Sequence, residues 1–323
     1  MHAKDIASIT AVAAAACFVS ICAFLRAGEG DAYPSKYITV VCPFSAGGGT
    51  DLLCRTLGAE MSKTLGKPVA VVNITGGAGA LGFVQGARAA ADAYTLTMLT
   101  FEITPLSLRG FAPVSPSDFE FVALLNSDPA CIAVPASSKI KDISGFVESS
   151  KSGAISVGNS GVGSVWHLAS EAFALKSGAK ISAVPFDGAS GAITAMIGGH
   201  IDAACVSAAE LKPHADSGKV RILATMSPSR LRTFAEVPTC KESGIDVDFS
   251  TWRAIAAPKG TPAKRIEILR KSLAEFSASA AAREFAEKTG SNLEFKGGAE
   301  FAETVARQGA QVTEIMRKIN LIK

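Results

Sequence analysis

Four glycine-rich segments are the part of this sequence best suited to binding a small anion. They are Pro43–Asp51, Thr75–Gly79, Gly158–Ser164 and Phe186–Gly191. Glycine allows a positive φ and lets a ligand approach the backbone N–H groups closely. Each segment leads into a helical pattern, and the first amides of a helix, together with its dipole, favour negative charge. Two such segments in each half of the chain could hold a dicarboxylate from both sides.

Short β-branched runs precede these segments, and helical patterns follow them. The first half is predicted to have strands at 38–42, 69–73 and 95–100, with helices at 51–65 and 83–91. A second cycle is predicted to have strands at 155–157, 182–185, 201–206 and 220–224, with helices at 165–176 and 189–197. This alternation predicts an α/β fold with parallel strands and right-handed crossovers.

The remaining segments predict how the two halves are joined. Strands are expected at 121–125, 131–134 and 249–256, and helices at 262–277, 280–289 and 299–318. A mainly helical tail is a poor domain alone, so we expect it to pack back on the first half. The predicted lobes are 33–125 plus 249–323, and 126–248, with two crossing segments and a cleft between them.

Ordinary helix capping is the alternative explanation for each glycine-rich segment. Thr50, Ser164 and Ser190 are all good N-cap residues. For one segment alone this explanation is sufficient. Four segments at equivalent positions after strands favour a shared binding role.

The first 32 residues have the architecture of a secretory signal peptide. Lys4 precedes an uncharged stretch from Ile6 to Leu25, and Gly30 and Ala32 suit cleavage before Tyr33. The alternatives are an uncleaved membrane anchor, because such a stretch can also span a bilayer, and lipidation at Cys17. All three place the folded body outside the cytoplasm, so we expect a periplasmic protein.

Composition excludes several classes of function. The net charge is only +3, and the basic residues are scattered, so no nucleic-acid partner is expected. The body contains five cysteines, without the spacing of a metal site, and most lie in apolar runs that predict burial. One disulfide remains possible in an oxidising compartment. The five are Cys42, Cys54, Cys131, Cys205 and Cys240.

One motif raises the possibility of an enzyme. Gly77, Gly79 and Gly82 form a G-x-G-x-x-G after a strand, and Glu102 follows about 20 residues later, as in dinucleotide-binding folds. Export away from the cytosolic cofactor pool and the lack of a convincing catalytic acid or base argue against a dehydrogenase. We therefore expect no enzymatic activity, no cofactor and no metal.

Long motifs covering nearly the whole body resemble the Bug-type, TctC-like periplasmic receptors of tripartite tricarboxylate transporters. The matching segments occur in the family's order and spacing. They are Tyr33–Lys36, Ile38–Asp51, Asn73–Gly82, Ala93–Leu96, Asp118–Leu125, Gly158–Leu168, Val184–Gly188, Gly198–Asp202, Glu236–Thr239 and Trp252–Pro262.

The resemblance implies a two-lobed, type II-like Venus flytrap that closes on a carboxylate held by backbone amides, small hydroxyls and ordered water. Its implied partners are the ligand and two membrane permease subunits, and we expect a monomer. The residues expected to line the pocket are Phe44, Ser45, Ala46, Gly47, Thr50, Gly76, Ala78, Gly79, Ser160, Gly163, Ser164, His167 and Ser207. For His167, helix packing or capping is an equally open role.

The chain departs from the family pattern at four places. Asp187 stands where a basic residue is usual, Ile74-Thr75 where Arg-Pro is usual, and Arg253 where an apolar or aromatic residue is common. The stretch Phe101–Phe111 is also shorter than expected. If Asp187 faces the cleft, it would oppose a second ligand carboxylate by about a few kcal/mol and favour an amino acid. Otherwise it is exposed or caps the next helix.

The sequence therefore predicts a receptor that captures a small carboxylate, either a di- or tricarboxylate or an acidic or amide amino acid, for transport. A receptor that presents its ligand to a signalling partner is the main alternative, and an exported NAD-dependent dehydrogenase is the less favoured one.

Overall fold

The computed structural model describes residues 33–323, and Tyr37–Lys323 form one compact unit. The signal-peptide prediction for residues 1–32 lies outside the described residues. Residues 33–36 contain bends but neither helix nor strand. None of the described helices is both long enough and apolar enough to cross a bilayer.

The elements of the unit alternate between strands and helices. The strands are β1 (Ile38–Cys42), β2 (Val69–Asn73), β3 (Thr95–Thr100), β4 (Phe119–Pro135), β5 (Ile155–Asn159), β6 (Ile181–Pro185), β7 (Ala203–Ser207), β8 (Val220–Thr225), β9 (Ser250–Pro258) and β10 (Leu293–Gly297). The α-helices are α2 (Gly49–Leu65), α3 (Ala80–Ala87), α4 (Ile103–Leu108), α5 (Ile143–Ser152), α6 (Val165–Ser177), α7 (Ala189–Ile197), α8 (Ala208–Asp216), α9 (Ala263–Ala278), α10 (Ala280–Thr289) and α11 (Gly298–Lys318). Short 3₁₀ turns lie at Gly77–Gly79, Pro116–Asp118, Arg232–Phe234 and Lys241–Ser243.

Helix α2 shows why the local patterns fold as they do. Leu53, Leu57 and Met61 recur on one face at helical spacing, and all three are fully buried. Gly66 ends the helix in the left-handed region with a φ of 64°, which glycine adopts without steric cost. The helix thus packs its apolar face inward and begins directly after a glycine-rich segment.

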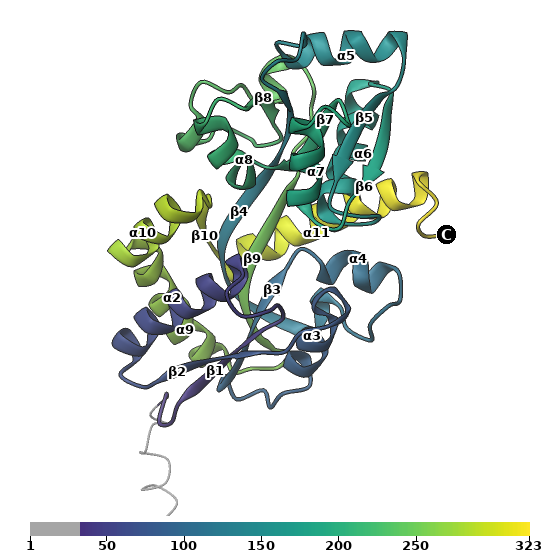
Figure 1. The fold of residues 1–323 in the computed structure, drawn as a ribbon. Helices are drawn as coiled ribbons and strands as arrows, with labels where there is room; N and C mark the ends of the chain where they lie inside the picture. The colour runs from purple at the N-terminus through teal and green to yellow at the C-terminus, as the bar shows by residue number, and fades with distance from the viewer. Residues whose placement is uncertain (1–32) are drawn as a thin grey trace, which may run out of the picture. The chain divides into compact units, whose positions relative to one another are not determined.

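Two groups of parallel strands make up the sheet. In the first group, β1 pairs with β2 and β3; in the second, β5 pairs with β6 and β7. The order across the whole sheet is β2-β1-β3-β9-β4-β7-β5-β6, with β8 and β10 also paired to β4. Figure 1 shows the second group with α5, α6 and α7 in the upper part of the unit, and the first group with α2 and α3 in the lower part.

Strand β4 runs through both groups. Its residues Phe119–Pro129 pair with β9, and Ala130–Pro135 pair with β7 and β8. The prediction of two separate strands at 121–125 and 131–134 is therefore wrong. Asn126–Pro129 has a turn-like composition, but antiparallel pairing with β9 keeps it extended. The chain entering β9 crosses beside it, where the Ala130 amide donates to Phe249 O at 2.9 Å. These two crossing segments confirm the two-lobed α/β architecture.

The tail returns to the sheet of the first group, as expected. Strand β9 lies between β3 and β4, and α9 packs on α2 and β4. The sequence did not predict β10, which pairs antiparallel with β4, and it missed α4, α5 and α8. Helix α11 contacts β4, α4 and α6. The division into 33–125 plus 249–323 and 126–248 stays a prediction.

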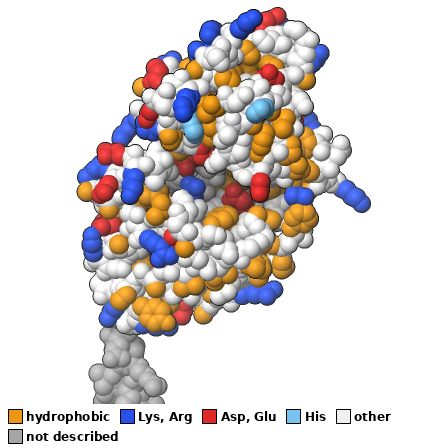
Figure 2. All heavy atoms as spheres, in the orientation of Figure 1, with side chains coloured by type: hydrophobic (Ala, Val, Ile, Leu, Met, Phe, Trp, Pro, Cys, Tyr) orange, Lys and Arg blue, Asp and Glu red, His pale blue; other side chains and the backbone are white. Residues whose placement is uncertain are grey.

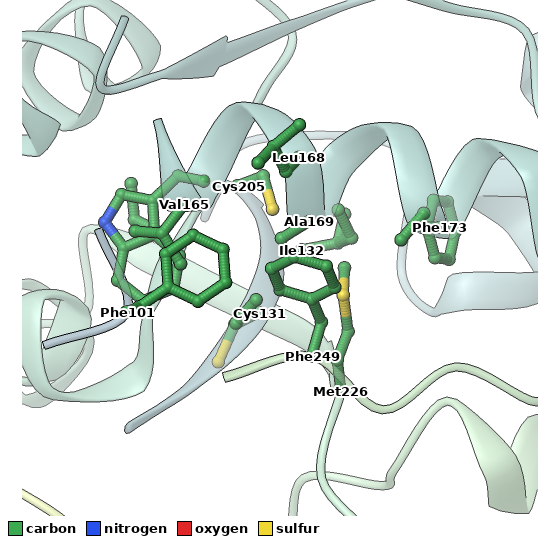
Figure 3. Close-up of a cluster of buried hydrophobic side chains, with 14 of the residues drawn as sticks. Phe101, Cys131, Ile132, Val165, Leu168, Ala169, Phe173, Cys205, Met226 and Phe249 are labelled. Carbon is green, nitrogen blue, oxygen red and sulfur yellow. The ribbon is translucent and has the colours of Figure 1, made fainter. Parts of the chain in front are cut away.

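A continuous hydrophobic core lies around the crossing segments. The rings of Phe101 and Phe249 lie 5.7 Å apart and are both fully buried. Figure 3 shows Phe249 and Met226 packed beneath Leu168, Ala169 and Phe173 of α6. The cysteines of the body, Cys42, Cys54, Cys131, Cys205 and Cys240, are all buried with free thiols, which confirms their predicted burial.

Candidate functional site

The glycine-rich segments after β1 and β2 lie side by side. Asn73, the last residue of β2, donates from Nδ2 to Phe44 O at 2.9 Å and to Asp51 Oδ1 at 2.8 Å. A Cβ on Gly79 would lie 3.0 Å from the Phe83 ring and 3.4 Å from the Phe44 ring, so only glycine fits comfortably there. Because β1 and β2 are parallel, both segments leave the same edge of the sheet.

Asp51 organises the first segment. Its buried carboxylate accepts from Arg55 Nε at 2.9 Å and from the Gly47 amide at 2.8 Å. The hydrogen bond from Arg55, reinforced by those from Gly47 and Asn73, lowers the pKa of Asp51 to about 2. The Gly47 amide is therefore engaged within the protein, and the role of Gly47 in lining the pocket stays a prediction.

Other amides of the first two segments have no acceptor anywhere in residues 33–323. Those of the first segment are Ser45, Ala46, Gly49, Thr50 and Asp51, of which the last three form the first turn of α2. Those of the second are Thr75, Gly76, Gly77 and Ala78. Residues 45–49 and 75–78 are exposed, whereas Thr50 and Asp51 are buried.

Ala78 is a local strain point in the second segment. It has a φ of 55° between glycines that also have positive φ. For an L-residue this left-handed backbone costs roughly 1–2 kcal/mol. Strain of this kind persists where the surrounding structure enforces it, often at functional sites.

The segment after β5 is closed partly by its own side chains. Gly161 donates its amide to Asn159 Oδ1 at 3.0 Å, and Gly163 donates to His167 Nδ1 at 3.0 Å. Ser164 caps α6 by accepting from the His167 amide at 3.2 Å. Within the described chain, the amides of Ser160, Val162, Val165 and Trp166 have no acceptor. The buried Asn159 Nδ2 also has no partner there.

The His167 side chain bonds the backbone of the glycine-rich segment that precedes α6. Its Nδ1 accepts the Gly163 amide, so the neutral ring carries its proton on Nε2, which lies 3.8 Å from Glu171 Oε1. Burial lowers the pKa of His167, and burial also raises the pKa of Glu171. This geometry favours the capping role that the sequence left open.

The segments after β6 and β7 lie at the carboxyl edge of the second strand group. Asp187 is exposed and makes no hydrogen bond or ion pair with any described residue, and the N-cap position of α7 is Gly188 without a side-chain bond. Asp187 therefore does not cap α7. Ser207 is buried and forms a capping box with Glu210, accepting from its amide at 3.2 Å and donating from Oγ to its Oε2 at 2.7 Å.

Arg253 on β9 links the start of α2 to the crossing strand β4. Its Nε donates to Thr50 Oγ1 at 2.9 Å, and its Nη1 donates to Asp128 Oδ2 at 3.0 Å. Burial of its carboxyl group raises the pKa of Glu210; the nearby charge of Asp128 acts in the same direction, and that of Arg253 opposes it. Figure 2 shows a hollow midway up the unit, where acidic and basic side chains gather. The sequence singled out Arg253 only as a departure and missed Asp128 and Glu210.

Two cavities lie away from the predicted residues. One of about 630 Å³ is bordered by α11, β10, the crossing strands and residues 227–232, and it includes Trp252, Arg307 and Gln308. Another of about 620 Å³ lies beside α10 and includes Arg283 and Ser291. Neither is lined by any predicted binding residue. The candidate site is instead the surface formed by the four glycine-rich segments, Ser207 and Arg253.

Comparisons with known proteins agree with this architecture. Residues 53–321 match the family model described as tripartite tricarboxylate transporter family receptor. Protein BugT of Bordetella pertussis is 31% identical over 266 residues, covering 80% of this chain and 81% of BugT. A TctC solute-binding protein from Polaromonas is 35% identical with a TM-score of 0.84, covering 88% of this chain and 99% of that one. MatC from Rhodopseudomonas palustris, solved with bound malate, is 26% identical with a TM-score of 0.71, covering 88% and 99%.

The environment of His167 predicts a pH dependence of stability. Because burial lowers its folded-state pKa, the unfolded chain binds the proton more readily below the ordinary value of about 6.5. The free energy of unfolding of the wild type should therefore fall as the pH drops from 7.5 through 6.5 to 5.5. The free energy of unfolding of His167→Gln should fall by less over the same range. Urea unfolding of both proteins at these three pH values tests this, with Glu171 present in both. Parallel pH profiles would show that His167 is not held neutral.

Proposed function

Because this chain belongs to the tripartite tricarboxylate transporter receptor family, we propose that it captures a small carboxylate in the periplasm for the membrane subunits of such a transporter. The observation that carries the proposal is the set of unpaired amides at the carboxyl edges of both parallel strand groups. The malate bound to the related MatC supports the same ligand class.

The chemistry of these edges suits a carboxylate. Helices α2, α6 and α7 each begin at such an edge, and their first amides have no acceptor within their own helix. Donors and dipole together stabilise an anion there. Proposed contacts are the backbones or side chains of Phe44, Ser45, Ala46, Gly49, Thr50, Gly76, Ala78, Ser160, Ser164 and Asp187. Gly47, Gly79, Gly163, His167 and Ser207 have polar groups that bond internally, so we propose that they shape the loops around the ligand.

The proposed protein binds and does not catalyse. Two side chains that could act as an acid or base at these edges are engaged in structure: His167 accepts the Gly163 amide, and Glu210 accepts the Ser207 amide in the capping box of α8. We propose that the ligand is a di- or tricarboxylate or an acidic or amide amino acid, and that the receptor acts as a monomer after its leader is removed.

A thermal-unfolding screen tests the proposed ligand class. The panel holds acetate, succinate, adipate, L-malate, citrate, L-aspartate, L-glutamate and L-glutamine. A ligand at 100 times its Kd should stabilise the folded state by about 2.7 kcal/mol. Indifference of the purified protein to every acid in the panel would overturn the proposal.

Gly49→Pro removes a single proposed donor without disturbing its helix. Gly49 is the first residue of α2, where proline is well tolerated, and the preceding Gly48 has the extended φ of −74° and ψ of 165° that proline requires. A Cβ at Gly49 meets no atom within 4 Å. Losing one hydrogen bond to a carboxylate should weaken binding roughly 10- to 100-fold.

Gly49→Ala is the matched control, because it adds the Cβ and keeps the N–H. Isothermal titration with the strongest acid from the panel should give wild-type affinity for Gly49→Ala within about a few-fold. Equal affinities for the proline and alanine variants would remove the α2 amides from the proposed site.

Asp187 predicts a preference among carboxylates. Its exposed, unpaired charge should disfavour a second ligand carboxylate and favour an ammonium group. Asp187→Asn should therefore raise the affinity ratio of succinate to L-aspartate. The two affinities, measured by titration of both proteins, give this ratio. An unchanged ratio would show that Asp187 lies outside the bound ligand's reach.

A further inference from the structure

Arg253 lies at the carboxyl edge of the first strand group. In the sheet it pairs with Thr100, the last residue of β3, on one side and with Asn126 of β4 on the other. Side chains alternate across a strand. The preceding Trp252 bonds Gln308 of α11 through Nε1 at 2.6 Å, and Arg253 points to the opposite face, toward α2.

The guanidinium of Arg253 is only partly used by the protein. Of its five N–H donors, Nε binds Thr50 Oγ1 and one on Nη1 binds Asp128 Oδ2. Nη2 has no acceptor in the described part of the chain, and 22% of the side chain is exposed to solvent. The remaining donors are therefore available to a ligand.

Asp128 fixes the direction of those donors. Its carboxylate is buried and also accepts from Asn126 Nδ2 at 2.8 Å, Ser291 Oγ at 3.1 Å and the Asn292 amide at 2.8 Å. Several neutral donors share the Asp128 carboxylate, so only one of the hydrogen bonds that this carboxylate accepts comes from Arg253. The ion pair positions the guanidinium and leaves most of its N–H groups unpaired.

A purely structural arginine in this protein looks different. Arg221 on β8 is also partly buried, and its Nη1 and Nη2 donate to the backbone carbonyls of Ala136, Ser138 and Ile140 at 3.1 to 3.4 Å. Both ends of that guanidinium are satisfied by the protein. At Arg253, by contrast, Nη2 and the second N–H of Nη1 have no acceptor in the described part of the chain, and they lie beside the start of α2.

We propose that Arg253 is a specificity-determining residue that forms a charged hydrogen bond with a ligand carboxylate resting on the first-turn amides of α2. This inference rests on the proposed function and deepens it. Thr50 brings the guanidinium of Arg253 close to the first-turn amides of α2. Its Oγ1 accepts a hydrogen bond from Arg253 Nε, and its own amide belongs to that first turn. A guanidinium matches a carboxylate in a planar, two-bonded arrangement that Lys cannot reproduce.

The ligand class follows from this arrangement. It must carry at least one ionised carboxylate, at the end that reaches the crossing strands. Glu210 bonds Ser207, which pairs with Ala130 of β4 two residues after Asp128, so the rest of the ligand should not place a second negative charge there. Exchange of the first carboxylate for a neutral group should cost most of the affinity.

Titration of four proteins with succinate, L-malate and L-aspartate tests the inference. Arg253→Met keeps the length of the side chain and removes its charge and donors, so affinity should fall roughly 10- to 100-fold. Arg253→Lys keeps the charge but not the fork and should recover part of that loss. Arg221→Met, the matched control outside the site, should bind like the wild type. Urea unfolding without ligand checks that each variant is folded.

The outcomes separate the inference from the proposed function. If the wild type binds none of the three acids, both fail. If it binds and Arg253→Met keeps its affinity, only the role of Arg253 is overturned. If Arg253→Met does not fold, Arg253→Lys decides: affinity equal to wild type contradicts the two-bonded contact, and a several-fold loss in a stable protein supports it.

Discussion

The first turn of an α-helix cannot satisfy its own amides, and this constraint explains most of the proposed site. Helices α2, α6 and α7 are among those that start at the carboxyl ends of parallel strands, and those strands form two groups connected through β4. Because the strands within each group are parallel, the helices that follow them start at the same edge. The unpaired donors of each group therefore lie at one edge of its strands, and an anion is a natural acceptor for such donors.

The protein selects which of these amides remain available. Asp51 accepts a hydrogen bond from the Gly47 amide, and His167 accepts one from the Gly163 amide. These bonds fix the shape of the two loops, while neighbouring amides of the same loops stay unpaired. Ala78 has a left-handed backbone and lies in the exposed turn after β2, where the neighbouring amides are also unpaired. The ion pair with Asp128 places the guanidinium of Arg253 at the crossing strands, beside the start of α2.

Strong local patterns were enough to predict the regular elements. The runs at β1, β2 and β3 and the helices α7 and α10 have the predicted bounds. Elements were missed where composition and tertiary context disagree. Asn126–Pro129 has a turn-like composition but stays extended beside β9, and α8, for which no helix was predicted, contains Pro213.

The site was predictable as loops but not as an arrangement of donors. Glycine-rich segments after strands could be located from the residues alone. Which amides are free depends on partners such as Asn73 and Asp51, far apart in sequence. The contact between Asp128 and Arg253 spans 125 residues, and no local pattern signals it.

Hydrogen exchange with and without a bound diacid tests the account most directly. Mass spectrometry should show slower exchange in peptides covering residues 44–52, 75–81, 160–166 and 186–191 when saturating succinate or L-malate is added. Peptides covering 227–232, which border the cavity beside α11, should exchange at unchanged rates. Protection at 227–232 with no change in the four glycine-rich segments would contradict the proposed site.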